Sequence, residues 1–116
     1  KDLKVMDSKV LLLGFTFKED CTDVRNTRVI DIYEEFLSFD IQVDVVDPWA
    51  DTEEVKHEYG LEVSNDLENL DLNDYSAVVL AVAHKEFQAL NIQAGDDQVV
   101  FDVKSILPKE KVDARL

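Results

Sequence analysis

Two short, uninterrupted apolar runs constrain the fold of this chain more than any other feature of its sequence. Residues 10–15 read VLLLGF and residues 77–82 read AVVLAV. Runs of this length without polar alternation are typical of strands buried on both faces, as in a parallel sheet. Weaker strand patterns occur at 41–46 (IQVDVV), 61–63 (LEV) and 99–103 (VVFDV). The sequence therefore predicts five strands.

The segments between these runs have the spacing of helices and turns. Apolar residues recur within 29–37 at the spacing that forms one stripe on a helix, and Asn26 or Thr27 is suited to cap its start. The proline after Asp47 ends the second strand, because proline cannot donate to a strand ladder. Further helical segments are expected at 53–59, closed by Gly60, at 66–70, and from Lys85.

The alternation of strands and helices indicates one α/β domain spanning residues 1–116. Connections long enough for crossovers favour a parallel sheet. We therefore expect a three-layer, Rossmann-like fold, with helices on both faces of a five-stranded parallel sheet in the order 3-2-1-4-5. A chain of 116 residues is long enough to bury one core without a metal or a disulfide.

The charge of the chain limits the partners that it can bind through a broad surface. Its 26 acidic and 12 basic residues give a formal net charge of -14. Nucleic acids and anionic membranes need clustered Lys and Arg, so neither is expected as a partner. Cys21 is the sole cysteine, and no apolar run approaches the roughly 20 residues of a membrane span, so a cytoplasmic setting is expected.

The segment 14–28 carries the most informative polar residues. It follows the first strand, where the strand order reverses and where ligands of such sheets bind. Its cations Lys18, Arg25 and Arg28 surround the start of the next helix, whose free N–H groups favour a phosphate, so a diphosphate would fit. The same cations can instead pair with acidic neighbours on a solvated loop, and spacing alone leaves both interpretations open. These neighbours are Glu19, Asp20 and Asp23.

A complete dinucleotide site is not expected in this segment, although Asp47 ends the second strand, where an acidic residue often binds a ribose. Such a site needs three glycines, which let the backbone turn tightly and approach a pyrophosphate. The stretch GFTFKE supplies only Gly14. NAD should therefore not bind here by that mechanism.

The segment GFTFKEDCTDVRNTRVIDI at 14–32 resembles the signature that opens the last domain of the UDP-glucose and GDP-mannose dehydrogenase family. The stretches DVVDPWAD, KHEYG, AVVLAVAHKEF and VVFDVKSILP follow in the family's order, so the resemblance spans nearly the whole chain. Within the family, RNTRVIDI, DPWAD and AVAHKEF look most similar to bacterial enzymes that act on UDP-N-acetylhexosamines.

The resemblance implies that the chain is the C-terminal, UDP-sugar-binding domain of a longer, NAD-dependent UDP-sugar 6-dehydrogenase. Such enzymes oxidise the C6 alcohol to a uronic acid in two NAD-dependent steps, hold the aldehyde-level intermediate on a cysteine, and supply surface polysaccharide precursors. That cysteine and most of the NAD site belong to the N-terminal and central domains, so this chain alone should be inactive. A UDP-N-acetylhexosamine is the expected substrate, with UDP-glucose as the alternative, and the full-length enzyme is expected to be a homo-oligomer.

The resemblance also assigns roles to four residues. Phe17 and Lys18 match the Phe-Lys pair that contacts the UDP-sugar, and Arg25 matches an arginine that reaches NAD bound on the N-terminal domain. Lys104 lies where UDP-glucose enzymes often carry a substrate-binding arginine, and we place it with the substrate contacts. DVKSILP departs from the family pattern at that position, since it carries a lysine. A lysine cannot make the two-pronged phosphate contact of arginine.

No catalytic or metal-binding residue is expected in the chain. Cys21 has no general base at a recognisable spacing in the sequence. His57 and His84 do not belong to a motif that contains a second ligand or a catalytic partner, so none of the three is given a role. Trp49 is expected to pack at the edge of the core rather than to stack on a base. The acidic run 66–74 lacks the spacing of a calcium loop and is expected to be a solvated face.

Two interpretations from other classes remain open. A signalling receiver domain also has five parallel strands and a lysine after the fifth, but it needs clustered carboxylates for magnesium, whereas Gly14, Phe15 and Ser64 stand at the relevant strand ends. A purely structural α/β module would close over another domain without touching a ligand. Only a ligand of the folded state raises the melting temperature, so adding magnesium or UDP distinguishes the alternatives.

Overall fold

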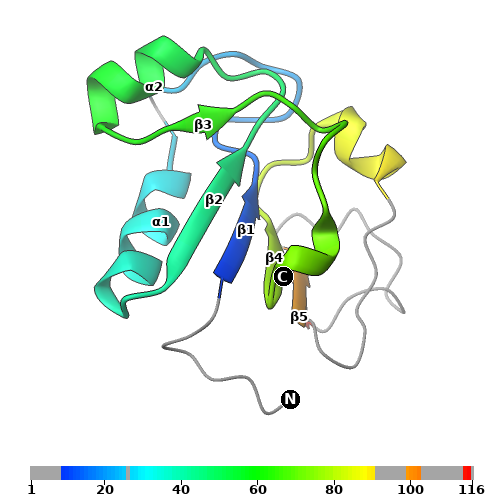
Figure 1. Cartoon of the computed structure of the whole chain (residues 1–116). Helices are drawn as coiled ribbons and strands as arrows, with labels where there is room; N and C mark the ends of the chain where they lie inside the picture. The colour runs from blue at the N-terminus through cyan, green and yellow to red at the C-terminus, as the bar shows by residue number, and fades with distance from the viewer. Residues whose placement is uncertain (1–8, 26, 91–98, 103–113, 116) are drawn as a thin grey trace.

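Six parallel strands form the centre of the part of the chain that the computed structural model describes, residues 9–25, 27–90, 99–102 and 114–115 (Figure 1). Their order is β3-β2-β1-β4-β5-β6. The strands are β1 (Lys9–Leu13), β2 (Gln42–Val46), β3 (Val63–Ser64), β4 (Ala77–Leu80), β5 (Val99–Asp102) and β6 (Ala114–Arg115). The helices are α1 (Val29–Ser38) and α2 (Thr52–Tyr59), and the 3₁₀ helices are η2 (Leu72–Asp74) and η3 (Lys85–Ala89).

The predicted strand order 3-2-1-4-5 is confirmed, and β6 extends the sheet beyond β5. The sequence does not predict β6, because a strand of two residues carries no hydrophobic period. β3 covers Val63–Ser64 instead of 61–63, and Leu61 is buried in the core just before it. β3 is therefore shorter than its apolar pattern indicates, and it begins later in the sequence.

The segment 66–70 forms a turn around an aspartate instead of the expected helical turn. The Asp66 carboxylate accepts the backbone N–H groups of Glu68 and Asn69 at 2.9 and 3.3 Å. Such local side-chain bonds compete with the hydrogen bonds of a helix. A short helical turn forms only further along, as η2.

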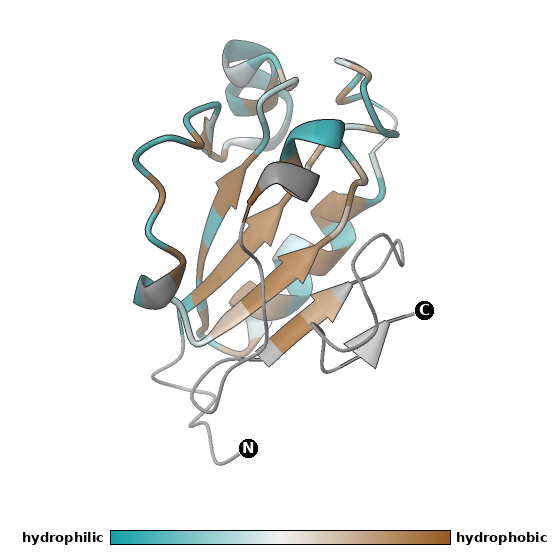
Figure 2. Ribbon diagram, turned by 90° about the vertical axis from the view of Figure 1, so that its right-hand side faces the viewer, coloured by the Kyte–Doolittle hydropathy of each residue, from teal (hydrophilic) through white to brown (hydrophobic). Residues whose placement is uncertain are grey.

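β1 lies between β2 and β4, and its side chains alternate between two cores. Val10 and Leu12 face the core that includes the apolar stripe of α1, while Leu11 and Leu13 face the other core. The second core is covered by leucines of the segment 67–72 and by the 3₁₀ helix η3. Apart from Lys9 at the start of β1, the central strands β1 and β4 consist of hydrophobic residues (Figure 2), as expected for strands buried on both faces.

Both helices begin and end close to the predicted positions. The N-cap position of α1 is Arg28, which makes no side-chain capping bond, so the expected cap at Thr27 is displaced by one residue, although Thr27 Oγ1 accepts the N–H of Val29 at 3.1 Å. Asn26, the other candidate cap, lies outside the described residues. The Asp51 carboxylate accepts two N–H groups in the first turn of α2. Gly60 ends α2 with a φ of 70°, the left-handed conformation that glycine adopts most easily.

Gly14 ends β1 in a conformation that other residues adopt only with strain. Its φ is 99°, and a Cβ atom at this position would lie 2.6 Å from the Cβ atom of Val82. Its N–H donates to the carbonyl of Val46 at 2.9 Å. The chain that leaves β1 therefore runs directly against the chain that leaves β4.

Candidate functional site

The loops that leave the carboxyl ends of β1, β2 and β4 meet at one edge of the sheet. The arrowheads of β1 and β2 point toward this edge in Figure 1, where the segment 14–28 crosses toward α1 and where α2 also lies. The chain passes to one side of β1 to form β2 and to the other side to form β4, so the strand order reverses here. Open α/β sheets bind their ligands at such a position.

Asp47, the first residue after β2, is buried beneath the segment 14–28, with an exposed fraction of 0%. Its Oδ2 accepts the N–H groups of Phe15 and Thr16 at 2.6 and 3.0 Å. Its Oδ1 accepts the N–H groups of Trp49 and Ala50 at 2.7 and 3.2 Å. Burial by itself raises the pKa of Asp47, but the hydrogen bonds from His84 and from the backbone outweigh it and hold the pKa below the usual 3.8.

His84, in the loop after β4, is also fully buried. Its Nε2 lies 2.9 Å from Asp47 Oδ2 and 2.9 Å from Thr16 Oγ1. Its Nδ1 accepts the backbone N–H of Asp20 at 2.8 Å. A backbone N–H can only donate, so Nδ1 carries no proton and the ring is neutral with its proton on Nε2. His84 therefore joins the loops that follow β1, β2 and β4.

The tip of the segment 14–28 is held from its inner side. The Thr16 hydroxyl donates to the Lys18 carbonyl at 3.0 Å, and the Phe17 N–H donates to the Asp23 carbonyl at 2.7 Å. Asp20 has a φ of 53°, and its carboxylate accepts the N–H of Lys85 at 3.2 Å. As a result the Phe17 side chain is directed outward, with an exposed fraction of 50%, and Lys18 is exposed beside it.

Arg25 lies in the same segment but is held by α2. The hydroxyl of Tyr59 donates to the Val24 carbonyl at 2.6 Å, which ties this part of the loop to the end of α2. The Arg25 guanidinium lies 3.7 Å from a Glu54 carboxylate oxygen and 4.0 Å from one of Asp23. Its side chain is 73% exposed, so these pairs are largely screened by water.

Three of the four residues that the sequence assigns to the site lie on one loop, while Lys104 lies outside the described residues. The interpretation that the loop cations pair with acidic neighbours fits Arg25. It does not fit Lys18 or Arg28, which make no ion pair with any residue that the structure describes. Lys18 thus remains available for an anion.

The sequence alone does not reveal the buried pair of Asp47 and His84 beneath the loop. The position of Asp47 at the end of a strand suggests only a ribose ligand, and its buried, fully bonded carboxylate cannot take that role. His84 has no partner in any sequence motif. One signal does point to the pair: the predicted strand order places the loops after strands one, two and four side by side.

The other singled-out side chains have structural roles or lie at the surface. Trp49 packs as predicted: its ring stacks on His84 with centroids 6.1 Å apart, and its Nε1 donates to Glu86 at 3.0 Å. His57 is exposed on α2. The half-buried Cys21 accepts a backbone N–H on its sulfur at 3.5 Å.

Two absences among the described residues, which leave out residues 26 and 116 and three longer stretches, bear on other classes of site. No group of three His, Cys, Asp or Glu side chains there is placed to hold a metal ion. No helix there is long and apolar enough to cross a membrane. In the same residues every buried side-chain nitrogen or oxygen has a hydrogen-bond partner, so the exposed groups are the ones left for ligands.

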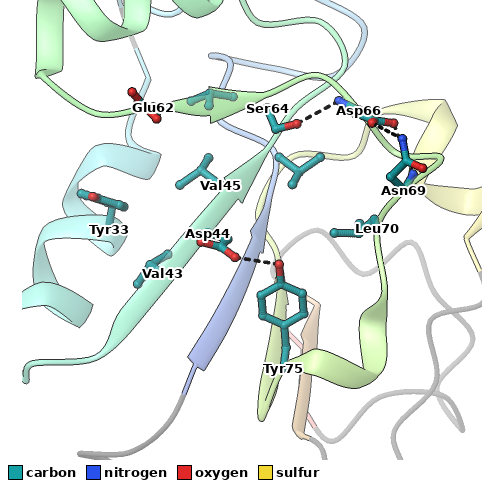
Figure 3. A pocket seen from close by; sticks show the side chains of 12 residues that line it. Tyr33, Val43, Asp44, Val45, Glu62, Ser64, Asp66, Asn69, Leu70 and Tyr75 are labelled. Atoms are coloured by element: carbon teal, nitrogen blue, oxygen red, sulfur yellow. Dashed lines mark hydrogen bonds between the residues drawn. The ribbon is translucent and has the colours of Figure 1, made fainter.

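A cavity of about 500 Å³ opens at a different place, along the edge formed by β2 and the short β3 (Figure 3). Its lining includes Asp44, Glu62 and Asp66. The hydroxyl of Tyr75 donates to Asp44 at 2.8 Å, and burial together with this hydrogen bond raises the pKa of Tyr75. Three carboxylates repel an anion, so this cavity does not fit the diphosphate that the loop cations suggest.

The sheet order, together with an anchored loop that exposes a free cation at the switch point, is typical of an α/β domain of the nucleotide-binding class. Residues 11–109 match the UDP binding domain of the UDP-glucose/GDP-mannose dehydrogenase family. The chain belongs to this family. The resemblance inferred from the motifs is confirmed, and the family match favours it over a receiver domain.

Two curated relatives are similar over essentially the whole chain. UDP-N-acetyl-D-glucosamine 6-dehydrogenase of Salmonella typhi is 40% identical over 121 residues, which cover 100% of this chain and 28% of the relative. The enzyme with the same name from Pseudomonas aeruginosa is 42% identical over 119 residues, which cover 98% of this chain and 28% of the relative. The chain therefore spans little more than a quarter of the length of these relatives.

Solved structures show the same fold. UDP-N-acetyl-mannosamine dehydrogenase from S. aureus superposes with a TM-score of 0.67 at 29% identity, over 93% of this chain and 25% of that one. NDP-N-acetyl-D-galactosaminuronic acid dehydrogenase from Methanosarcina mazei Go1 superposes with a TM-score of 0.76 at 24% identity, over 95% and 23% of the two chains. The second likeness is one of fold alone.

Proposed function

We propose that residues 1–116 are the C-terminal, UDP-sugar-binding domain of an NAD-dependent UDP-sugar 6-dehydrogenase, which oxidises the C6 alcohol of its substrate to a uronic acid. One observation carries this proposal. In a domain that matches the UDP binding domain of the family, Phe17 and Lys18 are exposed at the switch point on a backbone that buried side chains hold in place.

Lys18 is the residue best suited to the diphosphate. It is exposed and makes no ion pair with the residues that the structure describes, so its ammonium group keeps three donors for phosphate oxygens. Phe17 beside it exposes half of an apolar ring, which can pack on the flat face of a uracil or on a sugar. Together they supply the charge and the apolar contact that a UDP-sugar needs.

Arg25 and Lys104 complete the proposed ligand contacts. Arg25 is tied to α2 through Glu54, whereas the backbone near Lys18 is tied to the loop after β4. This separation supports a role for Arg25 on the NAD side and for Lys18 on the substrate side. Lys104 is proposed as a further substrate contact on the strength of the resemblance.

NAD itself fits poorly on this domain. The single glycine of the loop, Gly14, packs so closely on Val82 that no ligand can approach between them. The Asp47 carboxylate, which a ribose would need, is filled by four backbone N–H groups and His84. We therefore infer that NAD and the reactive cysteine are held mainly by the N-terminal and central domains.

The proposed substrate is a UDP-N-acetylhexosamine. This choice is supported by the two relatives of 40% and 42% identity, whose names specify UDP-N-acetyl-D-glucosamine. UDP-glucose is the second candidate, since UDP-glucose 6-dehydrogenase 4 of Arabidopsis thaliana is 33% identical over 57 residues. We propose that the enzyme is a cytoplasmic homo-oligomer and that its uronic acid product serves surface polysaccharide synthesis.

Titration of the 116-residue chain with UDP, followed by amide NMR, tests the proposed site directly. We expect UDP to shift the amide signals of residues 16–20 and Lys18→Ala to weaken that response. Lys56→Ala is the matched control, because Lys56 is an exposed lysine on α2. The chain alone should produce no NADH from any UDP-sugar.

Shifts confined to other parts of the domain, or an unchanged response in Lys18→Ala, would contradict the assignment of the site. A response to magnesium but not to UDP would favour the receiver interpretation instead. NADH formation by the purified chain would contradict the proposal that the N-terminal and central domains hold NAD and the reactive cysteine.

A further inference from the structure

Two hydrogen bonds fix the backbone on either side of the Lys18 side chain. The Lys18 carbonyl accepts the Thr16 hydroxyl at 3.0 Å, and the Asp20 N–H donates to His84 Nδ1 at 2.8 Å. The peptide groups between these two points cannot rotate freely without breaking one of the bonds. The direction in which Lys18 leaves the loop is therefore set by the buried side chains beneath it.

His84 contacts a group in each of these bonds. Nδ1 accepts one of them directly, while Nε2 lies 2.9 Å from Thr16 Oγ1 and 2.9 Å from Asp47 Oδ2. Because Thr16 gives its own proton to the Lys18 carbonyl, its oxygen is free to accept from Nε2–H. The Asp47 carboxylate accepts from the same N–H and orients the ring. The stacked ring of Trp49 covers the imidazole.

Only one form of the ring satisfies every partner. The Asp20 N–H requires a lone pair on Nδ1, and the Asp47 carboxylate requires a proton on Nε2. An apolar residue of similar size would fill the same space, but it would leave the Asp20 N–H without a partner and Thr16 without its donor. The hydrogen bonds of the ring therefore fix the backbone conformation of the loop, in addition to the packing that the ring provides.

We propose that His84, as a neutral imidazole with its proton on Nε2, is a positioning residue for UDP recognition that holds Lys18 in its binding direction. This inference rests on the proposed function and deepens it. A loop that is ordered before binding spares the ligand the entropic cost of ordering it. His84 acts through the backbone of residues 16–20 and touches no ligand.

A double-mutant cycle between His84 and Lys18 separates positioning from simple packing. In the wild-type chain, Lys18→Ala should weaken UDP binding by roughly 10- to 100-fold, the range for a hydrogen bond to a charged group. In a His84→Leu background the same change should weaken binding by less than about threefold, because the backbone no longer fixes the direction of the Lys18 side chain. His84→Gln should restore the larger factor, since an amide can accept and donate at these two positions.

An equal Lys18→Ala factor in the wild-type and His84→Leu backgrounds overturns the proposal, because a packing role alone leaves that factor unchanged. If His84→Leu does not fold, two measurements on the wild-type chain decide. Nitrogen-15 NMR of the ring should show the proton on Nε2, and the Asp20 amide should exchange slowly. A proton on Nδ1, or a rapidly exchanging Asp20 amide, overturns the proposal.

The failure of the proposed function is distinguishable from the failure of this inference. If the wild-type chain does not respond to UDP, the proposed function fails and the positioning role falls with it. If UDP binds and Lys18→Ala weakens it equally in every His84 background, the positioning role alone falls. Lys56→Ala should change UDP binding in none of these backgrounds, which controls for the general loss of a positive charge.

Discussion

The inner and outer sides of the segment 14–28 differ sharply although they meet between adjacent residues. Thr16 has an exposed fraction of 0%, while the adjacent Phe17 has one of 50%. On the inner side Asp47 and His84 are fully buried, and their polar atoms are all bonded. On the outer side the ammonium group of Lys18 is bonded to no residue that the structure describes.

This contrast separates two tasks that the same short loop performs. Buried polar groups must be satisfied, and once they are, their directional bonds hold the backbone in one conformation. The outer side chains contribute little to folding, because water solvates them well in the unliganded domain. Substitutions beneath the loop should therefore change stability, and ligand binding only through the backbone that they hold, while substitutions on its surface should change ligand binding directly.

The largest effect is expected at Asp47. Asp47→Ala leaves four backbone N–H groups without their acceptor and removes one of the two acceptors of the His84 N–H, and it should lower the free energy of unfolding by about 3–5 kcal/mol. Urea denaturation measures this loss. Glu62→Ala is the matched control: Glu62 has a side chain 86% exposed and pairs with Lys56 at 3.7 Å, so its loss should cost about 1 kcal/mol or less. Equal losses for the two variants would contradict the comparison.

The next effect is expected on the outer side, in catalysis by the full-length enzyme. Lys18→Ala should raise the KM for the UDP-sugar by the equivalent of about 1.5–3 kcal/mol, the value of a hydrogen bond to a charged group, while leaving the melting temperature nearly unchanged. Arg25→Lys should instead raise the KM for NAD and spare that for the UDP-sugar. Steady-state kinetics with each substrate varied in turn provide the test. An unchanged UDP-sugar KM and rate in Lys18→Ala would remove Lys18 from the site.

The two sides also differ in how far they could be predicted. Apolar runs reveal buried strands because burial on both faces leaves a readable pattern, and so the order of the first five strands follows. The roles expected of the outer residues Phe17, Lys18 and Arg25 come from the family signature. Nothing in the apolar pattern reveals Asp47 and His84, since buried polar residues have no period and their side chains come from positions 37 residues apart.

The short edge strands show the same limit. A strand of two residues, such as β3 or β6, is set by the neighbour that it pairs with and carries no periodicity of its own. Asp66 illustrates a second limit, because its carboxylate takes the N–H groups that a helical turn would have used. Local polar chemistry of this kind overrides a helical pattern as short as 66–70.

Protonation of Asp47 at low pH should lower the free energy of unfolding by less than Asp47→Ala does, because a protonated carboxyl group keeps part of its hydrogen bonding. The folded-state pKa of Asp47 lies below its usual value of 3.8, so the unfolded chain takes up this proton first as the pH falls. The stability from Asp47 is therefore complete above that usual value and is lost as the pH drops through the lower, folded-state pKa. Unfolding free energies of the wild type and of Asp47→Asn, measured on lowering the pH from about 5, should converge. Parallel pH profiles of the two proteins would show that Asp47 gains no stability from its ionised form.

The smallest effect is expected at the exposed ion pair that ties Arg25 to α2. Arg25 and Glu54 lie 3.7 Å apart, with side chains 73% and 38% exposed, so Glu54→Gln should change the free energy of unfolding by less than about 0.5 kcal/mol. Glu62→Gln is the matched control, because Glu62 pairs with Lys56 at the same distance and is also exposed. If Glu54→Gln instead costs several times as much as Glu62→Gln, then Arg25 is a structural residue of the loop and its assignment to the NAD side is wrong. A loss as small as that of the control leaves the guanidinium free to exchange Glu54 for a ligand, which is what a contact with a cofactor held by another domain requires.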